Sequence, residues 1–229
     1  LDFDVIGLVE NSPDDVEVML AATRKEKVED RVAVAEAAGL KPTVMDIESY
    51  AARAAISRLT EQMPNRAKGQ VLALFQIGSQ VMHVSMLLDD QLIYEREQPF
   101  GGHQLTQEIV RTYGLSYEEA EVKKRNNDLP DGYQTEILEP FLETAAQEVT
   151  RAIQFFFTST PYTRVDQLFL AGGCAIIPGM VDTVANRTKL SASVVSPFKG
   201  MQLSSNVREK QLRIEAPAYL CLLYTSPSP

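Results

Sequence analysis

The stretch that most constrains the fold is residues 71–102, VLALFQIGSQVMHVSMLLDDQLIYEREQPFGG, which has the pattern of three consecutive β-strands followed by a Gly-Gly turn. Residues 71–77 are apolar and partly β-branched, which is typical of a buried strand. We expect the next two strands at residues 81–88 and 91–99, with Asp89 and Asp90 forming the turn between them. A sheet therefore lies at the centre of the predicted fold.

The turn after the first of these strands is a candidate phosphate-binding site. Glycine at position 78 permits backbone conformations that other residues avoid and leaves room for a ligand. Backbone amides in such a turn, together with the Ser79 hydroxyl, can donate hydrogen bonds to phosphate oxygens. An ordinary antiparallel meander that turns at Gly78 explains the same residues, so that alternative stays open.

Composition excludes several classes of function. The net charge of −9 disfavours a general affinity for nucleic acid or for acidic lipids. No apolar run approaches the roughly 18 residues of a membrane span, and no signal peptide is visible. Cys174 and Cys221 form neither a disulfide framework nor a CxxC site, which favours a reducing compartment. The two histidines, His83 and His103, lack metal-ligand spacing.

Residues 1–70 carry the signals of a hairpin, a helix, a further strand and an alanine-rich helix. Apolar and acidic residues alternate over residues 1–8, which predicts a half-buried first strand. The predicted elements occupy residues 1–8, 16–23, 24–38, 42–47 and 49–62. The first helix places Val28, Val32 and Ala35 on one face, and Gly39 ends it. Residues 63–69 contain Pro and Gly and predict a connection between two lobes.

Helices and strands alternate through the rest of the chain. The predicted elements are helices at 105–113, 135–158 and 180–189, a helix capped by Ser116, and strands at 167–170 and 193–195. The helix 135–158 has an apolar stripe, which we interpret as core packing.

Two glycine turns remain once the common catalytic motifs are excluded. The chain has no GxxxxGK[ST], GxGxxG, GxSxG, HExxH or paired CxxC pattern. The turns at Gly78 and at Gly172-Gly173 each follow a predicted strand, and two such turns on one sheet could hold the two ends of a nucleotide. We expect the strand at 167–170 in the same sheet as residues 71–99, with the two turns opening on the same side. Between them, Glu121 and Lys124 lie one turn apart on one helix face, where a solvated salt bridge is the alternative interpretation.

Several segments together resemble the actin-like ATPase superfamily, more closely its FtsA family and most closely its PilM family of type IV pilus assembly proteins. The matching segments are LAATRKEKVEDRVAVAEAAGL, YEREQPFGGHQLTQEI, YGLSYEEA, LPDGYQTEILEPF, QFFF, LAGG, PF, LSS and APA. They cover almost all of residues 1–220.

The resemblance implies an α/β, actin-like (ribonuclease H-like) fold of two lobes around a nucleotide cleft, with the first lobe incomplete because an N-terminal phosphate motif is missing. The implied parts are a small FtsA-type subdomain 1C at 1–40, the end of subdomain 1A at 41–66, subdomain 2A at 67–104 and 165–220, and helical subdomain 2B at 105–164. Residues 221–229 resemble translated sequencing adapter, and we expect that tail to be non-native.

The resemblance also implies a nucleotide site, with phosphate and adenosine motifs at the two glycine turns and a Glu-x-x-Lys pair beside the ribose. The residues implied to bind ATP or ADP are Gly78, Ser79, Gln80, Gly101, Gly102, Glu121, Lys124, Gly172, Gly173 and Cys174. Glu48 falls where relatives carry a glutamate that could orient the attacking water, and a favourable charge at a helix N-terminus is the alternative interpretation. Gln76 replaces the aspartate that normally holds the Mg²⁺ shell, so we expect at most a slow ATPase, and weak binding of nucleotide by this chain.

The partner implied by the resemblance is the N-terminal cytoplasmic peptide of a bitopic inner-membrane pilus protein, similar to PilN, together with other pilus assembly proteins. The expected location is the cytoplasm, peripheral at the inner membrane through that partner. Residues 1–40 would form part of the peptide groove. The alternatives are an FtsA-like cell-division membrane anchor and a phosphotransferase of the superfamily, such as a sugar kinase.

Overall fold

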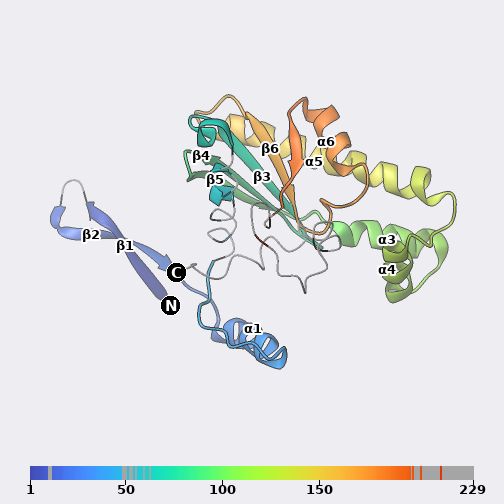
Figure 1. The fold of residues 1–229 in the computed structure, drawn as a ribbon, viewed down its shortest axis with the longest axis horizontal. Helices are drawn as coiled ribbons and strands as arrows, with labels where there is room; N and C mark the ends of the chain where they lie inside the picture. Colours follow the sequence, from blue (N-terminus) through green and yellow to red (C-terminus); the bar gives the residue numbers. More distant parts are fainter. Residues whose placement is uncertain are drawn as a thin grey trace. The chain divides into compact units, whose positions relative to one another are not determined.

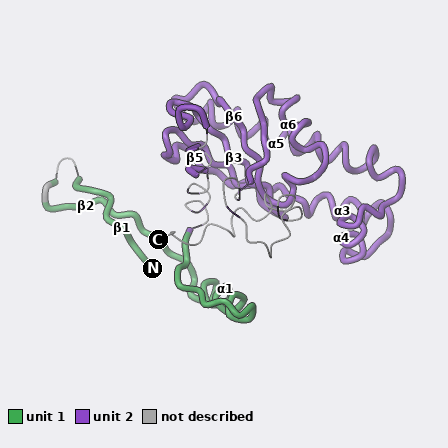
Figure 2. Tube along the Cα trace, viewed as in Figure 1, with its two compact units in different colours: residues 1–46 green, residues 47–229 purple. Residues whose placement is uncertain are grey.

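The structure is a computed structural model that describes residues 1–9, 12–47, 51, 54, 56–58, 60–61, 63–196, 198, 202 and 212. The chain divides into two compact units, Leu1–Asp46 and Ile47–Pro229 (Figure 2).

The first unit is an antiparallel hairpin followed by one helix. Strands β1 (Asp2–Val9) and β2 (Ser12–Ala21) pair from Asp2↔Ala21 to Val9↔Ser12, with two irregularities in register. The predicted hairpin is therefore confirmed, but the prediction that its first strand is half-buried is wrong. Every residue of β1 is exposed, because no second layer covers the hairpin among the described residues of this unit.

Helix α1 (Lys25–Ala37) matches its prediction closely. Its predicted face, Val28, Val32 and Ala35, is the partly buried one. Gly39 has a φ of +77°, and its N–H donates to the Glu36 carbonyl while the Leu40 N–H donates to Ala35. This is the hydrogen-bond pattern of a Schellman C-cap. The strand predicted at 42–47 is wrong: the segment is irregular, and no described strand pairs with it.

The second unit is built on a five-stranded sheet with strand order β5-β4-β3-β6-β7 (Figure 1). Strands β3, β4 and β5 form an antiparallel meander, whereas β3 with β6 and β6 with β7 are parallel. Asp89 and Asp90 both have positive φ, as a two-residue hairpin turn requires. The strands are β3 (Val71–Ile77), β4 (Met82–Leu88), β5 (Gln91–Gln98), β6 (Gln167–Ala171) and β7 (Ala192–Val194).

The helices of this unit follow the predicted order with two corrections. Helix α3 begins at Gly102 and not at residue 105, and the helix predicted from 135 opens with a π-helical segment. Among residues 49–62, the described ones at 51, 54, 56–58 and 60 are helical. The elements are η1 (Pro64–Ala67), α3 (Gly102–Tyr113), α4 (Tyr117–Asn126), η2 (Gln134–Leu138), α5 (Glu139–Ser159) and α6 (Met180–Thr188).

Strand alternation divides the core between the two faces of the sheet. In β3 the residues Val71, Ala73, Phe75 and Ile77 join one cluster with α3, α5 and α6. The intervening residues Leu72 and Leu74 join a smaller cluster with Ile56 and Phe169. All seven residues of β3 are buried, so this strand is the centre of the fold and fixes where its C-terminal turn lies.

Candidate functional site

The two predicted glycine turns lie at the same edge of the sheet. Strands β3 and β6 are parallel neighbours, with Gln76 opposite Ala171 in the last pair of their register. Each turn begins one or two residues further on, at Gly78 and at Gly172. The C-terminal ends of adjacent parallel strands place the following turns side by side. The prediction that both turns open on one side is therefore confirmed.

A third turn, Gly101-Gly102, packs directly against the first. The N–H of Gly102 donates to the Gly78 carbonyl at 3.0 Å, and the N–H of His103 donates to the Ser79 carbonyl at 2.7 Å. A Cβ at position 101 would lie 2.4 Å from the Ser79 carbonyl oxygen, closer than any side chain permits. Glycine at 101 therefore allows the start of α3 to lock onto the turn after β3.

The turn after β6 uses its two glycines differently. Gly172 has a φ of +87°, and a Cβ there would lie 2.4 Å from the Ile77 carbonyl oxygen. Gly173 is exposed, and a Cβ there would meet nothing within 4 Å. Gly172 is thus required for packing against β3, whereas the backbone at Gly173 is open to approach by another molecule.

Gly78 does not need a left-handed conformation, which corrects the expectation from sequence. Its φ is not among the positive values of the described glycines, and the constraint is one of space, since a Cβ would lie 3.1 Å from the Val81 carbonyl oxygen. The N–H of Gly78 donates to that same carbonyl at 3.0 Å. Ser79 and Gln80, at the tip of the turn, are exposed.

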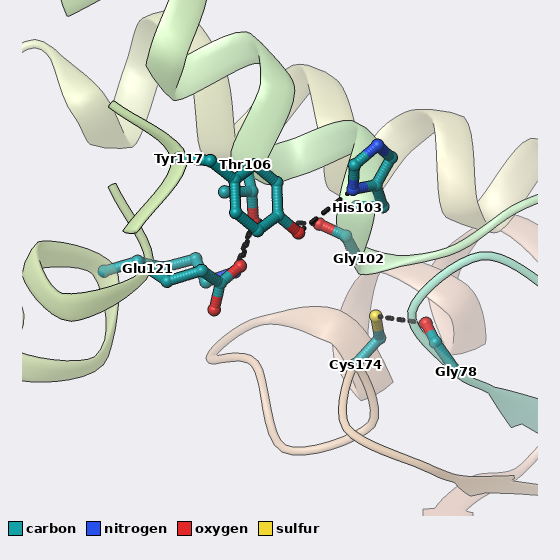
Figure 3. A network of polar contacts seen from close by, with 8 residues as sticks. Gly78, Gly102, His103, Thr106, Tyr117, Glu121 and Cys174 are labelled. Carbon is teal, nitrogen blue, oxygen red and sulfur yellow. Dashed lines mark hydrogen bonds and ion pairs between the residues drawn. The ribbon is translucent and has the colours of Figure 1, made fainter. Parts of the chain in front are cut away.

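The buried Cys174 side chain links the turn after β6 to the turn after β3. Its thiol donates to the Gly78 carbonyl at 3.5 Å, and its backbone N–H donates to the Ile77 carbonyl (Figure 3). Burial raises the thiol pKa to about 11, although the Lys124 charge and the Gly102 N–H oppose that rise. The thiol is therefore protonated and can donate at neutral pH, and Cys174 acts as a tie between two turns.

Glu121 and Lys124 form a contact, and a third side chain completes it. Lys124 Nζ donates to Glu121 Oε1 at 2.6 Å and to Thr106 Oγ1 at 2.6 Å, while the Thr106 hydroxyl lies 2.5 Å from the same Glu121 oxygen. Figure 3 shows Thr106 and Glu121 turned toward each other from α3 and α4. The predicted pair is therefore a partly buried three-residue ring and not a solvated salt bridge.

Local sequence signals place α4 so that this ring can form. Ser116 caps the helix: its hydroxyl accepts from the Glu119 N–H, and the Glu119 carboxylate accepts from the Ser116 N–H. The hydrogen bond from the Ser116 N–H to the carboxylate, with a smaller contribution from the Ser116 side chain, holds the pKa of Glu119 below its ordinary value. The capping box fixes the first turn of α4, and Glu121 and Lys124 follow on one face at i,i+3 spacing.

Burial of Glu121 would by itself raise the pKa of its carboxyl group. Hydrogen bonds from Lys124 and Thr106, with the charges of Lys124 and Arg125, outweigh burial and hold that pKa below its ordinary value. Side-chain exposure is 33% for Glu121 and 23% for Lys124, so both groups are reachable from solvent. The pair can offer one anionic acceptor and one cationic donor to a ligand.

Thr106 and Tyr117, near the turns, were missed in the sequence. Thr106 is fully buried on α3, one turn after Gly102, whose carbonyl its hydroxyl also approaches at 3.3 Å. His103 Nδ1 lies 3.0 Å from the Tyr117 hydroxyl, and their rings are 5.2 Å apart. A polar residue inside the buried stripe Leu105, Thr106, Ile109 was the available signal for Thr106.

Of the two residues proposed for hydrolysis, the structure describes Gln76. Gln76 is 7% exposed and lies in the β3 register on the face of Leu72 and Leu74. Glu48 lies outside the described residues. The described part of the chain contains no group of three or more His, Cys, Asp or Glu side chains that could hold a metal ion.

Comparison with known proteins identifies the family. The family model described as type IV pilus assembly protein PilM matches residues 1–223. The chain belongs to the PilM family. Among the helices of the described residues, none has the length and apolar content needed to cross a bilayer.

Solved structures similar to this PilM-family chain share its fold. A PilM-PilN type IV pilus biogenesis complex matches with a TM-score of 0.75 and 23% identity, over 99% of this chain and 66% of that one. The ethanolamine utilization protein EutJ from Carboxydothermus hydrogenoformans matches with a TM-score of 0.54 and 17% identity, over 84% of this chain and 58% of that one.

MreB5 of Spiroplasma citri bound to ADP matches with a TM-score of 0.51 and 14% identity, over 77% of this chain and 62% of that one. The PilM-family chain thus spans less than two thirds of each of these structures. The predicted α/β actin-like ATPase fold is confirmed.

Proposed function

We propose that this PilM-family protein is a nucleotide-binding scaffold of type IV pilus assembly, and that it binds the N-terminal cytoplasmic peptide of a PilN-like membrane-anchored partner. The observation that carries the nucleotide proposal is the packing of three glycine turns at one sheet edge, next to the Glu121–Lys124 pair. A similar fold in a protein whose structure holds ADP is consistent with it.

The residues present fit the two ends of ADP or ATP. The turn at Gly78, Ser79 and Gln80 is exposed at its tip and would hold the phosphates through its amides and hydroxyl. The Gly173 backbone, which has open space beside it, would lie against the nucleoside. Glu121 and Lys124 would hold the ribose hydroxyls. Gly101, Gly102, Gly172 and Cys174 would act by holding these turns together.

Substitution of one lysine tests this site, with its neighbour as a matched control. Lys124→Ala should weaken ADP binding, because the side chain lies on the Glu121 face and contacts both Glu121 and Thr106. Lys123→Ala should have little effect, because Lys123 points elsewhere and pairs with Asp128. Calorimetric titration of ADP to millimolar concentration measures both. Equal, negligible effects would return the pair to a structural salt bridge.

Slow hydrolysis is the second part of the proposal. Magnesium assists phosphoryl transfer when anionic oxygens support its shell. At position 76, where the resemblance implies an aspartate beside the magnesium shell, this chain has only the neutral amide of Gln76. Glu48 is the candidate to orient the attacking water. Gln76→Asp should raise magnesium-dependent ATP turnover with the fold unchanged. A large drop in melting temperature that Mg-ATP does not reverse would instead place position 76 in the core.

The partner proposal follows from family membership and from a similar structure that is a PilM-PilN complex. The protein would act in the cytoplasm at the inner membrane, with nucleotide fixing the peptide groove. Binding of a fluorescent peptide from the cytoplasmic end of the PilN-like protein, measured with and without ADP, tests this. A sugar-kinase function would appear instead as transfer of labelled phosphate in a sugar screen, and an FtsA-like anchor as binding to vesicles.

A further inference from the structure

The Thr106 hydroxyl is the third member of a hydrogen-bonded ring with Glu121 and Lys124, which the sequence predicted only as a pair. It accepts from Lys124 Nζ at 2.6 Å and donates to Glu121 Oε1 at 2.5 Å, and Lys124 also donates to that oxygen at 2.6 Å. Thr106 is fully buried, so water cannot take over these two hydrogen bonds. The ring therefore depends on this one hydroxyl.

The ring uses only some of the donors of Lys124 and only one carboxylate oxygen of Glu121, so the other donor and oxygen remain for a ligand. An ammonium group has three donors, and two of those on Lys124 are directed to Thr106 and Glu121. Both donors to the Glu121 carboxylate converge on Oε1, and the described residues give Oε2 no donor. Figure 3 shows one carboxylate oxygen toward Thr106 and the other turned away from it. One anionic acceptor and one cationic donor remain side by side.

That remaining combination matches two neighbouring hydroxyl groups. One hydroxyl can donate to the carboxylate oxygen while the adjacent one accepts from the ammonium N–H. A ribose carries such a diol, and a 2′-deoxyribose does not. We propose that Thr106 is a positioning residue that fixes Oε1 of Glu121 and the Lys124 ammonium, so that the open oxygen and N–H select ribonucleotides over deoxyribonucleotides. This inference rests on the proposed function.

Thr106 also joins the pair to the glycine turns. Its hydroxyl oxygen lies 3.3 Å from the Gly102 carbonyl, and the Gly102 N–H donates to the Gly78 carbonyl. The position of the pair is thereby set relative to the turn proposed for the phosphates. A side chain of the same shape without the hydroxyl should keep the packing of α3, but it should no longer hold Glu121 and Lys124 in position.

Two substitutions at position 106 separate the hydroxyl from the volume. Thr106→Val keeps the shape and removes both hydrogen bonds, whereas Thr106→Ser keeps the hydroxyl. The unsubstituted protein should bind ADP about tenfold or more tighter than 2′-deoxyADP, since a hydrogen bond to a charged group is lost. T106V should reduce that ratio to about threefold or less, and T106S should restore it. Calorimetric titration of both nucleotides gives the ratios.

The outcomes distinguish this inference from the proposed function. Equal weakening of ADP and 2′-deoxyADP by T106V, with the ratio unchanged, would make Thr106 merely structural and overturn the inference alone. Binding of neither nucleotide by the unsubstituted protein would overturn the proposed function, and the selection of ribonucleotides with it.

A measurement without nucleotide keeps the positioning role testable by itself. Because Thr106 donates to the carboxylate, T106V should raise the pKa of Glu121, followed by NMR titration of its side-chain carbon, and T106S should not. An unchanged Glu121 pKa in T106V, with a native-like melting curve, would overturn the positioning role.

Discussion

The two units contain similar local signals but differ in what those signals bury. Unit Leu1–Asp46 forms a hairpin and a capped helix, and none of its described residues is buried. Unit Ile47–Pro229 forms a hairpin of the same kind from β3 and β4, and there nearly every strand residue is buried, because helices pack on one face and a second apolar cluster with Ile56 packs on the other. Pairing of consecutive strands in a hairpin thus follows from local sequence, whereas burial depends on a second layer.

The glycines show the same contrast at single residues. Gly39 and Gly172 both have a positive φ, at +77° and +87°. A Cβ at Gly39 would meet nothing within 4 Å, whereas at Gly172 it would meet the Ile77 backbone. The first glycine ends a helix, and the second allows two strand ends to approach.

The largest difference in stability is expected between alanine substitutions at two phenylalanines, one in each hairpin. Phe75→Ala removes a ring with 0% exposure and should lower the free energy of unfolding by about 3–5 kcal/mol. Phe3→Ala, at 66% exposure, should change it by less than about 0.5 kcal/mol. Guanidinium unfolding measures both. A comparable loss for Phe3→Ala would mean that the hairpin is covered in solution.

The two glycines should give the next largest difference. Alanine at a positive φ costs about 1–2 kcal/mol at either site. Gly172→Ala adds a backbone clash of the overpacking kind, which costs a further 1–3 kcal/mol or so. Gly172→Ala should therefore destabilise the protein more than Gly39→Ala in the same unfolding experiment. Equal losses would show that the turn after β6 can move away from Ile77.

Helix capping gives a smaller effect. Ser116→Ala removes the capping box of α4 and should cost about 1 kcal/mol. Helix α1 has Arg24 at its N-cap, with no side-chain hydrogen bond, so Arg24→Ala should cost far less. Hydrogen exchange at the first turn of each helix reports the two losses. Similar protection of α4 before and after Ser116→Ala would contradict the capping argument.

The smallest effect expected is on the stability of the protein at acidic pH. Because the pKa of Glu121 is held below its ordinary 4.5, the ionised carboxylate stabilises the folded state above pH 4.5, and this contribution is lost as pH falls further. Glu121→Gln should therefore flatten the loss of melting temperature below pH 4.5. Glu29→Gln, in an exposed ion pair of α1, is the control and should leave the melting temperature nearly unchanged at neutral pH. Matching acid profiles for the unsubstituted protein and Glu121→Gln would show that the ring adds no stability.

Much of the fold was predictable because its signals are local. The strand at residues 71–77, the Asp89-Asp90 turn, the Gly39 and Gly114 helix ends and the Ser116 cap each depend on a few adjacent residues. The strand predicted at 42–47 failed because a strand needs a partner, which local sequence does not reveal. Exposure of the first hairpin was missed for the same reason.

The candidate site was predictable only in part. Spacing along α4 indicated that Glu121 and Lys124 share a face, and glycine runs indicated the turns. Thr106 was not predicted, because its partners lie 15 and 18 residues away on another helix.

The sequence by itself determined the elements, the two glycine turns and the family resemblance, because propensity, capping and turn chemistry act over a few residues. Only the tertiary structure decided that β6 lies beside β3, which brings Gly172 against Ile77 and Cys174 against Gly78. It also decided that α3 brings the Thr106 hydroxyl between Glu121 and Lys124. Contacts between residues about 95 apart depend on the packing of whole strands, and no local pattern encodes them.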